Sequence, residues 1–210
     1  MVYDPGVKGF DSNFWKGDTA NLLADTVKNA IKIGDTGLVG SASSYSKYLF
    51  GDFEFTIRTD CLSPDSNDSE KYWGLRNLSD TQNRGAAYFS MSYDTTAGDS
   101  SDTTRPFYAV VHGEDTGRRY RRIIQWDSAW DNSVNTRYRI IWDADQYKFL
   151  INDTVYATVA EGVEDSNGDE VLLNKQIPQA VRLSNRSLDT TDTSVTTLKL
   201  LNIRNAQKVI

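Results

Sequence analysis

The sequence predicts an all-β protein, a two-sheet antiparallel β-sandwich. Short segments alternate apolar and polar residues along the chain, which is the pattern of strands with one buried face. Polar turn residues separate these segments, and almost no stretch has the periodicity of a helix. The chain has eleven Tyr, eight Phe and five Trp, and aromatic residues suit a pleated sheet. We therefore expect about a dozen short strands arranged in a sandwich.

The clearest strand pattern is a three-stranded meander in Arg137–Val159. Its first two legs alternate apolar and polar residues, as strands with one buried face do. Asp143–Gln146 forms a polar break between these legs, suited to a hairpin turn. Asn152 and Asp153 then predict a second tight turn into the third strand.

The remaining strands follow from the same alternation. They are expected at Ala30–Ile33, Leu38–Ser41, Gly51–Asp60, Tyr72–Asn77, Ala86–Tyr93, Phe107–His112, Arg119–Trp126, Gln179–Asn185 and Val195–Asn205. In the last segment the apolar parity changes between Leu200 and Leu201, and a β-bulge would reconcile the two halves. Asn21–Asn29 is compatible with a helical turn.

Length and composition limit the class of protein. We expect one domain over residues 1–210, since β-sandwiches often reach 210 residues alone. The single Cys61 excludes an intrachain disulfide and a cysteine-based zinc cluster, and the single His112 excludes a multi-histidine metal site. The net charge of −6 argues against nucleic acid or an anionic membrane as the main partner.

The sequence shows no targeting segment and no membrane span. The first 25 residues lack an apolar stretch behind a basic start, so no signal peptide is expected. No apolar run approaches the roughly 20 residues that cross a bilayer. We therefore expect synthesis in the cytoplasm and no membrane insertion.

Three stretches of the chain resemble the concanavalin A-like lectin/glucanase superfamily, the laminin G/glucanase-type jelly roll. They are the opening Phe10–Trp15, the strand Leu49–Arg58 with the letters LFGDFEFTIR, and the hairpin Tyr138–Asn152. Leu198–Arg204 fits the closing strand of such domains. The resemblance implies a jelly roll of two large antiparallel sheets, with ligands bound across the concave sheet.

The superfamily includes glycoside hydrolases, and their carboxylate motif is absent here. Laminarinase- and lichenase-type enzymes carry a strand of the form E-[ILV]-D-x-x-E, which places two catalytic carboxylates on one face. Here Asp52 and Glu54 share the face of an opening strand, and the central candidate Ala86–Tyr93 has no carboxylate. We therefore expect that the chain is not an enzyme and has no catalytic residues.

A glycan-binding face is expected on the concave sheet. If Trp73, Phe89 and Phe107 point into the core, the opposite face carries aromatic, hydroxyl and guanidinium groups, which bind sugars. The predicted ligand residues are Tyr72, Arg76, Tyr88, Tyr108, His112, Trp126 and Trp130. The alternative is that these are ordinary outward residues of a sheet partly covered by loops.

A basic stripe stands out in this acidic chain. Arg118, Arg119, Arg121 and Arg122 lie in one predicted strand, where they form a candidate site for an anionic glycan or an acidic protein partner. The alternative, which we favour, is that these charges protect a sheet edge from pairing with another chain.

One loop has the composition of a weak calcium site. Asp165, Asn167 and Asp169 offer oxygen ligands at alternate positions, so calcium is the one metal considered. The glycine and the final glutamate of a calcium loop are not in their places. We favour a hairpin turn at Asn167-Gly168 and expect no cofactor.

Together these features predict a non-enzymatic jelly-roll protein of a virion surface or appendage, serving in decoration, tail or adhesion, that binds carbohydrate on its concave sheet. The expected partners are other subunits of a homo- or hetero-oligomeric assembly and polysaccharide, and the expected location is a virion or extracellular surface. The alternatives are a free-standing lectin-like module and a glycoside hydrolase with atypical carboxylates.

Overall fold

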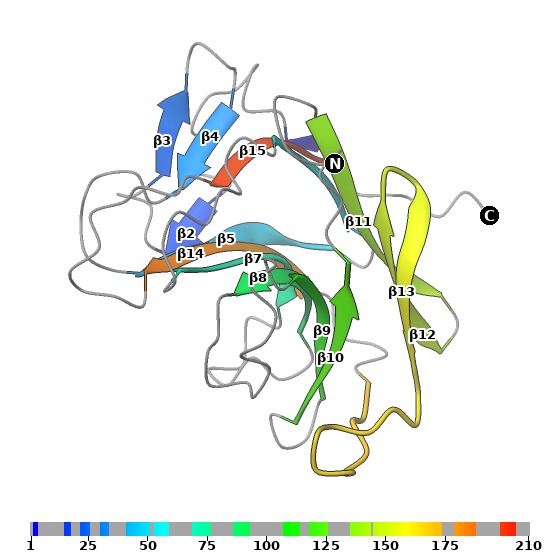
Figure 1. Cartoon of the computed structure of the whole chain (residues 1–210). Helices are drawn as coiled ribbons and strands as arrows, with labels where there is room; N and C mark the ends of the chain where they lie inside the picture. The colour runs from blue at the N-terminus through cyan, green and yellow to red at the C-terminus, as the bar shows by residue number, and fades with distance from the viewer. Residues whose placement is uncertain are drawn as a thin grey trace.

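The strands of the protein form two facing antiparallel sheets (Figure 1). The computed structural model describes residues 2–3, 15–17, 22–25, 30–33, 41–50, 53–58, 69–76, 86–92, 107–113, 118–125, 135–143, 145–173, 179–187 and 198–204. Within these residues all regular structure is strand, so the all-β prediction is confirmed. This part of the chain contains no helix that is long and apolar enough to cross a bilayer.

The first sheet, called sheet A, has eight strands. In spatial order they are β13 (Thr154–Ala160), β12 (Gln146–Ile151), β11 (Asn135–Asp143), β6 (Phe53–Arg58), β15 (Leu198–Arg204), β4 (Ala30–Ile33) and β3 (Leu22–Asp25), while β1 (Val2–Tyr3) also pairs with β15. The β11–β12–β13 meander has the two predicted turns. Asn152 and Asp153 both have positive φ, 48° and 66°, as a two-residue type I′ turn requires.

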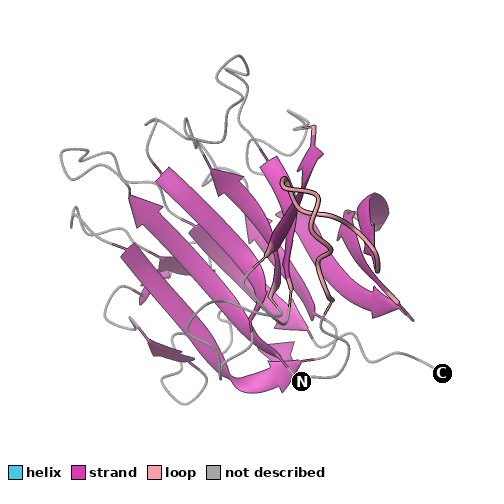
Figure 2. Ribbon diagram, turned by 90° about the horizontal axis from the view of Figure 1, so that it is seen from below, coloured by secondary structure: helices cyan, strands magenta, loops and turns pink. Residues whose placement is uncertain are grey.

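The second sheet, called sheet B, has seven strands. In spatial order they are β10 (Arg119–Ile124), β9 (Phe107–His112), β8 (Ala87–Ser92), β7 (Ser69–Arg76), β14 (Gln179–Ser187), β5 (Ser41–Phe50) and β2 (Trp15–Gly17). Figure 2 shows these strands running side by side across the molecule. The jelly-roll prediction of two large antiparallel sheets is therefore confirmed.

An aromatic cluster fills the space between the sheets. Trp73, Phe89 and Phe107 of sheet B are fully buried, with the Trp73 ring centroid 6.1 Å from Phe89 and 5.8 Å from Phe107. Tyr138 of sheet A meets the Trp73 ring edge-on at 5.1 Å, and Phe149 meets Phe89 at 5.2 Å. Edge-to-face contacts of this kind stabilise a core beyond the area that they bury.

Strands β3 and β5 differ from the sequence-based expectation. Leu22–Asp25 is strand β3, although Asn21–Asn29 was compatible with a helical turn. β5 runs over Ser41–Phe50, far beyond the short strand expected at Leu38–Ser41. Its serine-rich segment offers little contrast between apolar and polar positions, so alternation does not reveal it. The predicted bulge in the last strand is confirmed, because the register of β15 against β6 shifts between Leu200 and Asn202.

Candidate functional site on the outer face of sheet B

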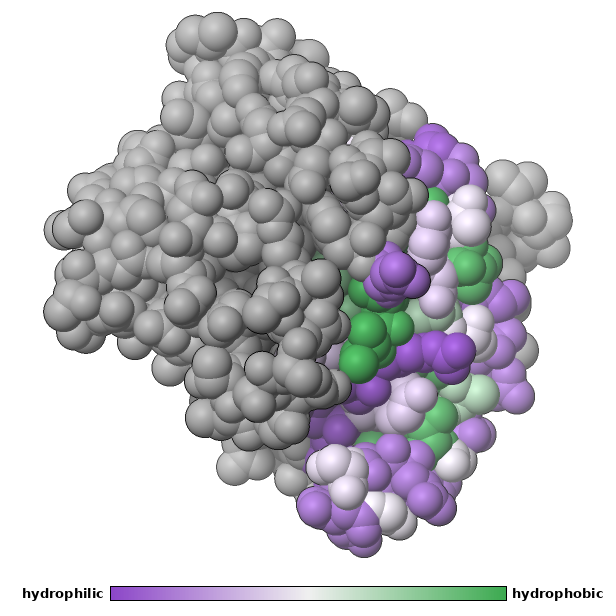
Figure 3. Space-filling model, in the orientation of Figure 1, coloured by the Kyte–Doolittle hydropathy of each residue, from purple (hydrophilic) through white to green (hydrophobic). Residues whose placement is uncertain are grey.

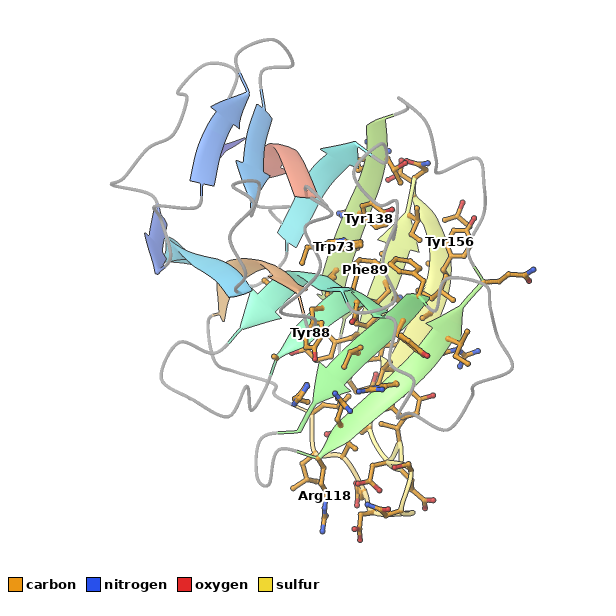
Figure 4. All side chains as sticks on the ribbon, turned by 60° about the vertical axis from the view of Figure 1, so that its left-hand side comes forward. Trp73, Tyr88, Phe89, Arg118, Tyr138 and Tyr156 are labelled. Atoms are coloured by element: carbon orange, nitrogen blue, oxygen red, sulfur yellow. The ribbon has the colours of Figure 1, made fainter. Side chains whose placement is uncertain are left out.

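The face of sheet B that points away from sheet A is called the outer face. Side chains alternate across a strand, so residues next to the buried Trp73, Phe89 and Phe107 lie on this face. Figure 4 shows Trp73, Phe89 and Tyr138 between the sheets and Tyr88 on the other side of sheet B. The predicted division of sheet B into a core face and an outer face is confirmed.

Cross-strand register arranges the outer face in four rows. The first row contains Ala180 and Arg76 on β14 and β7, with His112 and Arg119 on β9 and β10. The second row contains Arg182, Gly74, Tyr88, Val110 and Arg121. The third row contains Ser184, Tyr72, Ser90, Tyr108 and Ile123. The fourth row contains Arg186, Glu70 and Ser92.

Tyr88 and His112 form a pair at the centre of this face. The Tyr88 hydroxyl and His112 Nε2 are hydrogen-bonded at 2.9 Å, and the two ring centroids lie 5.6 Å apart at 29°. His112 is only 8% exposed, while Tyr88 is half-buried. A phenol bonded to an imidazole in a confined site is an arrangement that transfers protons.

Gly74 makes room for this pair. A Cβ atom at Gly74 would lie 2.4 Å from both Cα and Cβ of Tyr88, which is shorter than any real contact. β7 and β8 therefore approach each other at this point only because residue 74 has no side chain.

Tyr108 and Arg121 form a second pair one step from Tyr88. The Arg121 guanidinium carbon lies 5.8 Å from the centroid of the Tyr108 ring, within the range of a cation–π contact. Ser90 and Val110 beside them are 4% and 2% exposed, although they belong to the outer face. Neighbouring atoms therefore cover the centre of this face, and Tyr88, Tyr108 and Arg121 are half-buried there.

The predicted glycan residues are only partly brought together. Tyr72 and Arg76 occupy outer-face register positions on β7, and Tyr88, Tyr108 and His112 stand together on β8 and β9. Trp126 and Trp130 lie outside the described residues. Among the predicted residues of sheet B, the structure describes the side chains of Tyr88, Tyr108 and His112, and the binding of glycan stays a prediction.

The four arginines of the basic stripe separate. Arg119 and Arg121 take outer-face positions, whereas Arg122 has the opposite parity and pairs with buried Ala109. Arg118 points to the 165–170 loop, where its Nη2 lies 3.6 Å from Asp169 Oδ1 and its Nη1 donates to the Glu170 carbonyl at 3.3 Å. The stripe is thus not one surface.

β10 and β13, the outermost strands of the two sheets, contact each other along one side of the sandwich. The exposed apolar side chains described in the structure are Ile123, Val155, Tyr156 and Leu172. On the side shown in Figure 3, green apolar side chains alternate with purple polar and charged ones. The described residues form no broad apolar patch here.

The candidate calcium loop is a hairpin turn. The Gly168 amide donates to the Asp165 carbonyl at 3.1 Å, and Gly168 has a φ of +82°. The Asp165 carboxylate accepts the amides of Asn167 and Asp169 at 2.8 and 3.1 Å, so the carboxylate stabilises the turn itself. No group of three or more metal-ligating side chains occurs among the described residues.

Glu70 belongs to a sheet B strand, which sequence reasoning missed. The strand was expected to begin at Tyr72, but β7 begins at Ser69, so Glu70 takes a register position opposite Ser92. It is the only Asp or Glu in the sheet B strands that the structure describes. The central strand β8 has none, as the sequence indicated.

The comparisons with known proteins place this fold among glycoside hydrolases. The apo Crh5 transglycosylase has a TM-score of 0.67 at 13% identity, covering 99% of this chain and 84% of that one. A Bacillus licheniformis β-glucanase has a TM-score of 0.63 at 10% identity, and the match covers 99% of this chain and 98% of that one. A glycoside hydrolase family 16 endo-glucanase from Bacteroides ovatus has a TM-score of 0.62 at 11% identity, and the match covers 97% of this chain and 98% of that one. No family model and no curated protein matches.

These likenesses contradict the prediction of a non-enzymatic virion or appendage protein. The named structures above are two glucanases and a transglycosylase, and none of them is a virion, tail or adhesion component. The prediction treated one missing carboxylate motif as evidence against all catalysis, although a fold can host more than one chemistry. The expectations "not an enzyme" and "virion component" were therefore wrong, and the glycoside hydrolase alternative is better supported.

At these identities the comparison establishes the fold, and it agrees with the resemblance found in the sequence. The chain is a jelly-roll sandwich of two antiparallel sheets, the fold that these two glucanases and this transglycosylase share.

Proposed function

We propose that the protein is a glycoside hydrolase or transglycosylase that takes a polysaccharide across the outer face of sheet B. Two observations support this. The sandwich resembles such enzymes over nearly the whole chain. The outer face has a confined proton-transfer pair at its centre, with aromatic and cationic groups beside it.

The hydrogen bond between Tyr88 and His112 carries the proposal. Cleavage of a glycosidic bond needs a group that protonates the leaving oxygen and a group that activates the attacking one. Most glycosidases use two carboxyl groups, about 5 Å apart in retaining enzymes and about 6.5–9.5 Å apart in inverting ones. The described strands of sheet B offer Glu70 alone, so they cannot supply such a pair.

Glu70 is also badly placed to act together with Tyr88. It stands opposite Ser92, four residues along β8 from Tyr88, which is roughly 13 Å at about 3.3 Å per residue. Its cross-strand neighbour on β14 is Arg186, an oppositely charged residue. The proposal therefore assigns proton transfer to Tyr88 and His112 and gives Glu70 no catalytic part.

In the proposed reaction Tyr88 gives its phenolic proton to the glycosidic oxygen as the bond to the anomeric carbon breaks. His112, which begins the cycle as an imidazolium, replaces that proton from Nε2 through the 2.9 Å hydrogen bond and becomes neutral. The oxygen of a water, or of a second sugar hydroxyl, bonds to the anomeric carbon and its proton returns to the imidazole. Water as the acceptor gives hydrolysis, and a sugar hydroxyl gives transglycosylation.

The test is the change Tyr88→Phe, which removes the hydroxyl and keeps the ring. We expect kcat on a cleaved polysaccharide to fall at least about 100-fold with KM little changed, because general acid–base groups contribute roughly 10²–10⁴-fold. Reducing-end release measures hydrolysis, and the mass distribution of products from a labelled oligosaccharide measures transfer.

Tyr156→Phe is the matched control, since Tyr156 is a 38% exposed tyrosine on β13 of sheet A. It should keep the wild-type rate. Glu70→Gln separates the two chemistries. If Glu70→Gln abolishes turnover and Tyr88→Phe does not, a carboxylate performs the reaction and the assignment to Tyr88 fails. Binding of glycans without turnover of any of them would contradict the proposed function itself.

A further inference from the structure

The hairpin at residues 164–170 carries an Asn-Gly step at its tip. The Asp165 amide donates to the Asp169 carbonyl at 2.8 Å, and the Gly168 amide donates to the Asp165 carbonyl at 3.1 Å. Gly168 has a φ of +82°. This is the pattern of a three-residue hairpin loop whose last residue is left-handed. Asn167 and Gly168 are therefore the second and third residues of that loop.

The tip of this hairpin is open to water. Ser166, Asn167 and Gly168 are all exposed. Because glycine has no side chain, nothing on residue 168 itself shields its amide nitrogen from the side chain of Asn167. An asparagine in this position is among the thermally labile residues of a protein.

The Asn167 side chain can react with the backbone that follows it. The Gly168 amide nitrogen loses its proton to water and bonds to Asn167 Cγ, the bond from Cγ to the side-chain nitrogen breaks, and that nitrogen leaves as ammonia with a proton returned from water. Water then opens the cyclic imide at Cγ, which gives aspartate, or at the Asn167 carbonyl carbon, which gives isoaspartate. Overall, asparagine and water become aspartate or isoaspartate and ammonia.

The folded turn opposes this reaction through Asp165. The Gly168 N–H that must lose its proton is hydrogen-bonded to the Asp165 carbonyl. The Asp165 carboxylate accepts the amides of Asn167 and Asp169 at 2.8 and 3.1 Å. Closing the imide ring fixes the backbone rotation between Asn167 and Gly168, which these hydrogen bonds already hold in the geometry of the turn. The reaction therefore proceeds from opened turns, whose population depends on Asp165.

We propose that Asn167 is a site of spontaneous deamidation and that the hydrogen bonds of Asp165 set its rate. The isoaspartate product adds a methylene to the backbone of the loop, so the loop cannot keep its hydrogen bonds to Asp165. Arg118 contacts the same hairpin through Asp169 and the Glu170 carbonyl (Figure 4). The modification therefore loosens the contact between this hairpin and the start of β10, and neither step involves the outer face of sheet B.

The experiment follows the conversion of each asparagine over time in the whole folded protein. The protein is incubated in mildly alkaline buffer, digested at acidic pH and mapped by mass spectrometry of its peptides. The same protein unfolded in urea gives the rate without the turn. We expect Asn167 to deamidate in the folded protein, but more slowly than in the unfolded chain.

Asn152 is the comparison within the same molecule. It is exposed and lies in the turn between β12 and β13, as Asn167 lies in its own turn. Asn152 is followed by Asp153, whose side chain shields the amide nitrogen that would attack. In the folded protein we therefore expect Asn152 to convert more slowly than Asn167.

Asp165→Ala tests the role of the turn. It removes the carboxylate that accepts two amides, so the rate at Asn167 in the folded protein should rise about tenfold, toward the unfolded value. Asp165→Asn keeps an oxygen acceptor and should raise the rate less. Asp145→Ala is the matched control, because it removes an exposed carboxylate from the turn between β11 and β12, and it should keep the wild-type rate. Circular dichroism checks that each variant folds.

Three results would overturn the proposal. The first is conversion of Asn167 in the urea-unfolded chain but in neither the folded wild type nor folded Asp165→Ala, because the folded tip would then be unreactive. The second is an equal rate in Asp165→Ala and Asp145→Ala, which would remove the role of Asp165. The third is conversion of Asn152 as fast as that of Asn167, which would show that exposure alone decides the site.

Discussion

At the scale of single residues, Gly74 constrains the outer face most tightly. Tyr88 occupies the space where a side chain at residue 74 would lie, and the Tyr88 hydroxyl is hydrogen-bonded to His112. Glycine in a strand usually weakens it, but here it allows a close approach that positions the proposed catalytic pair. The proposed proton transfer therefore depends on a residue that has no side chain.

Gly74→Ala should destabilise the protein and impair the site together. The new Cβ would lie 2.4 Å from Tyr88 Cα, so β7 and β8 must move apart. We expect a loss of about 1–3 kcal/mol in the free energy of unfolding, as for other overpacked cores. Urea unfolding followed by circular dichroism measures it.

Gly168→Ala is the comparison for this prediction. A side chain is also unfavourable at Gly168, because its φ is positive and not because neighbouring atoms crowd the position. It should cost about 1 kcal/mol and leave turnover unchanged. If Gly74→Ala were as mild and kept full activity, the crowding at Tyr88 would not matter.

The residue scale also shows what the sequence could not reveal. Alternation predicted that Tyr88, Tyr108 and His112 share a face, because each is adjacent to a buried aromatic or aliphatic position. Alternation could not predict the hydrogen bond between Tyr88 and His112, since these residues are 24 positions apart in the sequence and meet only through the β8–β9 register. Register depends on packing of whole strands.

At the scale of elements, the β12–β13 hairpin shows local sequence determining structure. Asn152 and Asp153 adopt the positive φ angles of a type I′ turn, and Arg137 of β11 contacts both of these residues. The Arg137 amide donates to Asn152 Oδ1 at 2.9 Å, and the Arg137 guanidinium pairs with the Asp153 carboxylate. The turn was predictable because these two residue types tolerate such angles.

Asn152→Ala and Asp153→Gly should have unequal effects on stability. Asn152→Ala places a side chain with no affinity for positive φ and removes the hydrogen bond to Arg137, so we expect a loss of about 1–2 kcal/mol. Asp153→Gly relieves the backbone while it removes a mostly exposed ion pair worth about 0–1 kcal/mol, so its net effect should be near zero. Thermal unfolding of both variants checks the order, and a larger loss for Asp153→Gly would contradict it.

Elements without strong contrast were harder to predict. β5 carries the letters SASSYSKYLF, whose small polar residues hide the alternation, and most of that strand was missed. β7 begins at Ser69, so it includes Glu70, although the polar sequence there is typical of a loop. In both cases pairing with β14 overrides weak local preference.

At the scale of the whole molecule, one aromatic core joins the two sheets. Trp73 contacts Phe89 and Phe107 in its own sheet and Tyr138 in the other. The fold class was predictable because it follows from strand count and turn spacing. The function was mispredicted, because a missing motif excludes one arrangement of carboxylates and leaves other chemistry open.

Trp73→Ala should cost about 3–5 kcal/mol in the free energy of unfolding, since a fully buried tryptophan is replaced by a cavity. Trp73→Phe keeps part of the ring contacts and should cost clearly less. Chemical denaturation of both variants tests this. A small loss for Trp73→Ala would show that the sheets do not depend on this cluster.

The ion pair between Arg118 and Asp169 has a consequence for how the sandwich opens. It joins the residue before β10 to the loop that follows β13, and both side chains are partly exposed. β10 and β13 are the outermost strands of the two sheets and contact each other. Pairs of this kind contribute at most about 1 kcal/mol and weaken as salt is added. The sheets should therefore separate along this line before the Trp73 cluster is disturbed. In hydrogen–deuterium exchange, the amides of β10 and β13 should exchange earlier than those of β7 and β8, and salt should widen that interval.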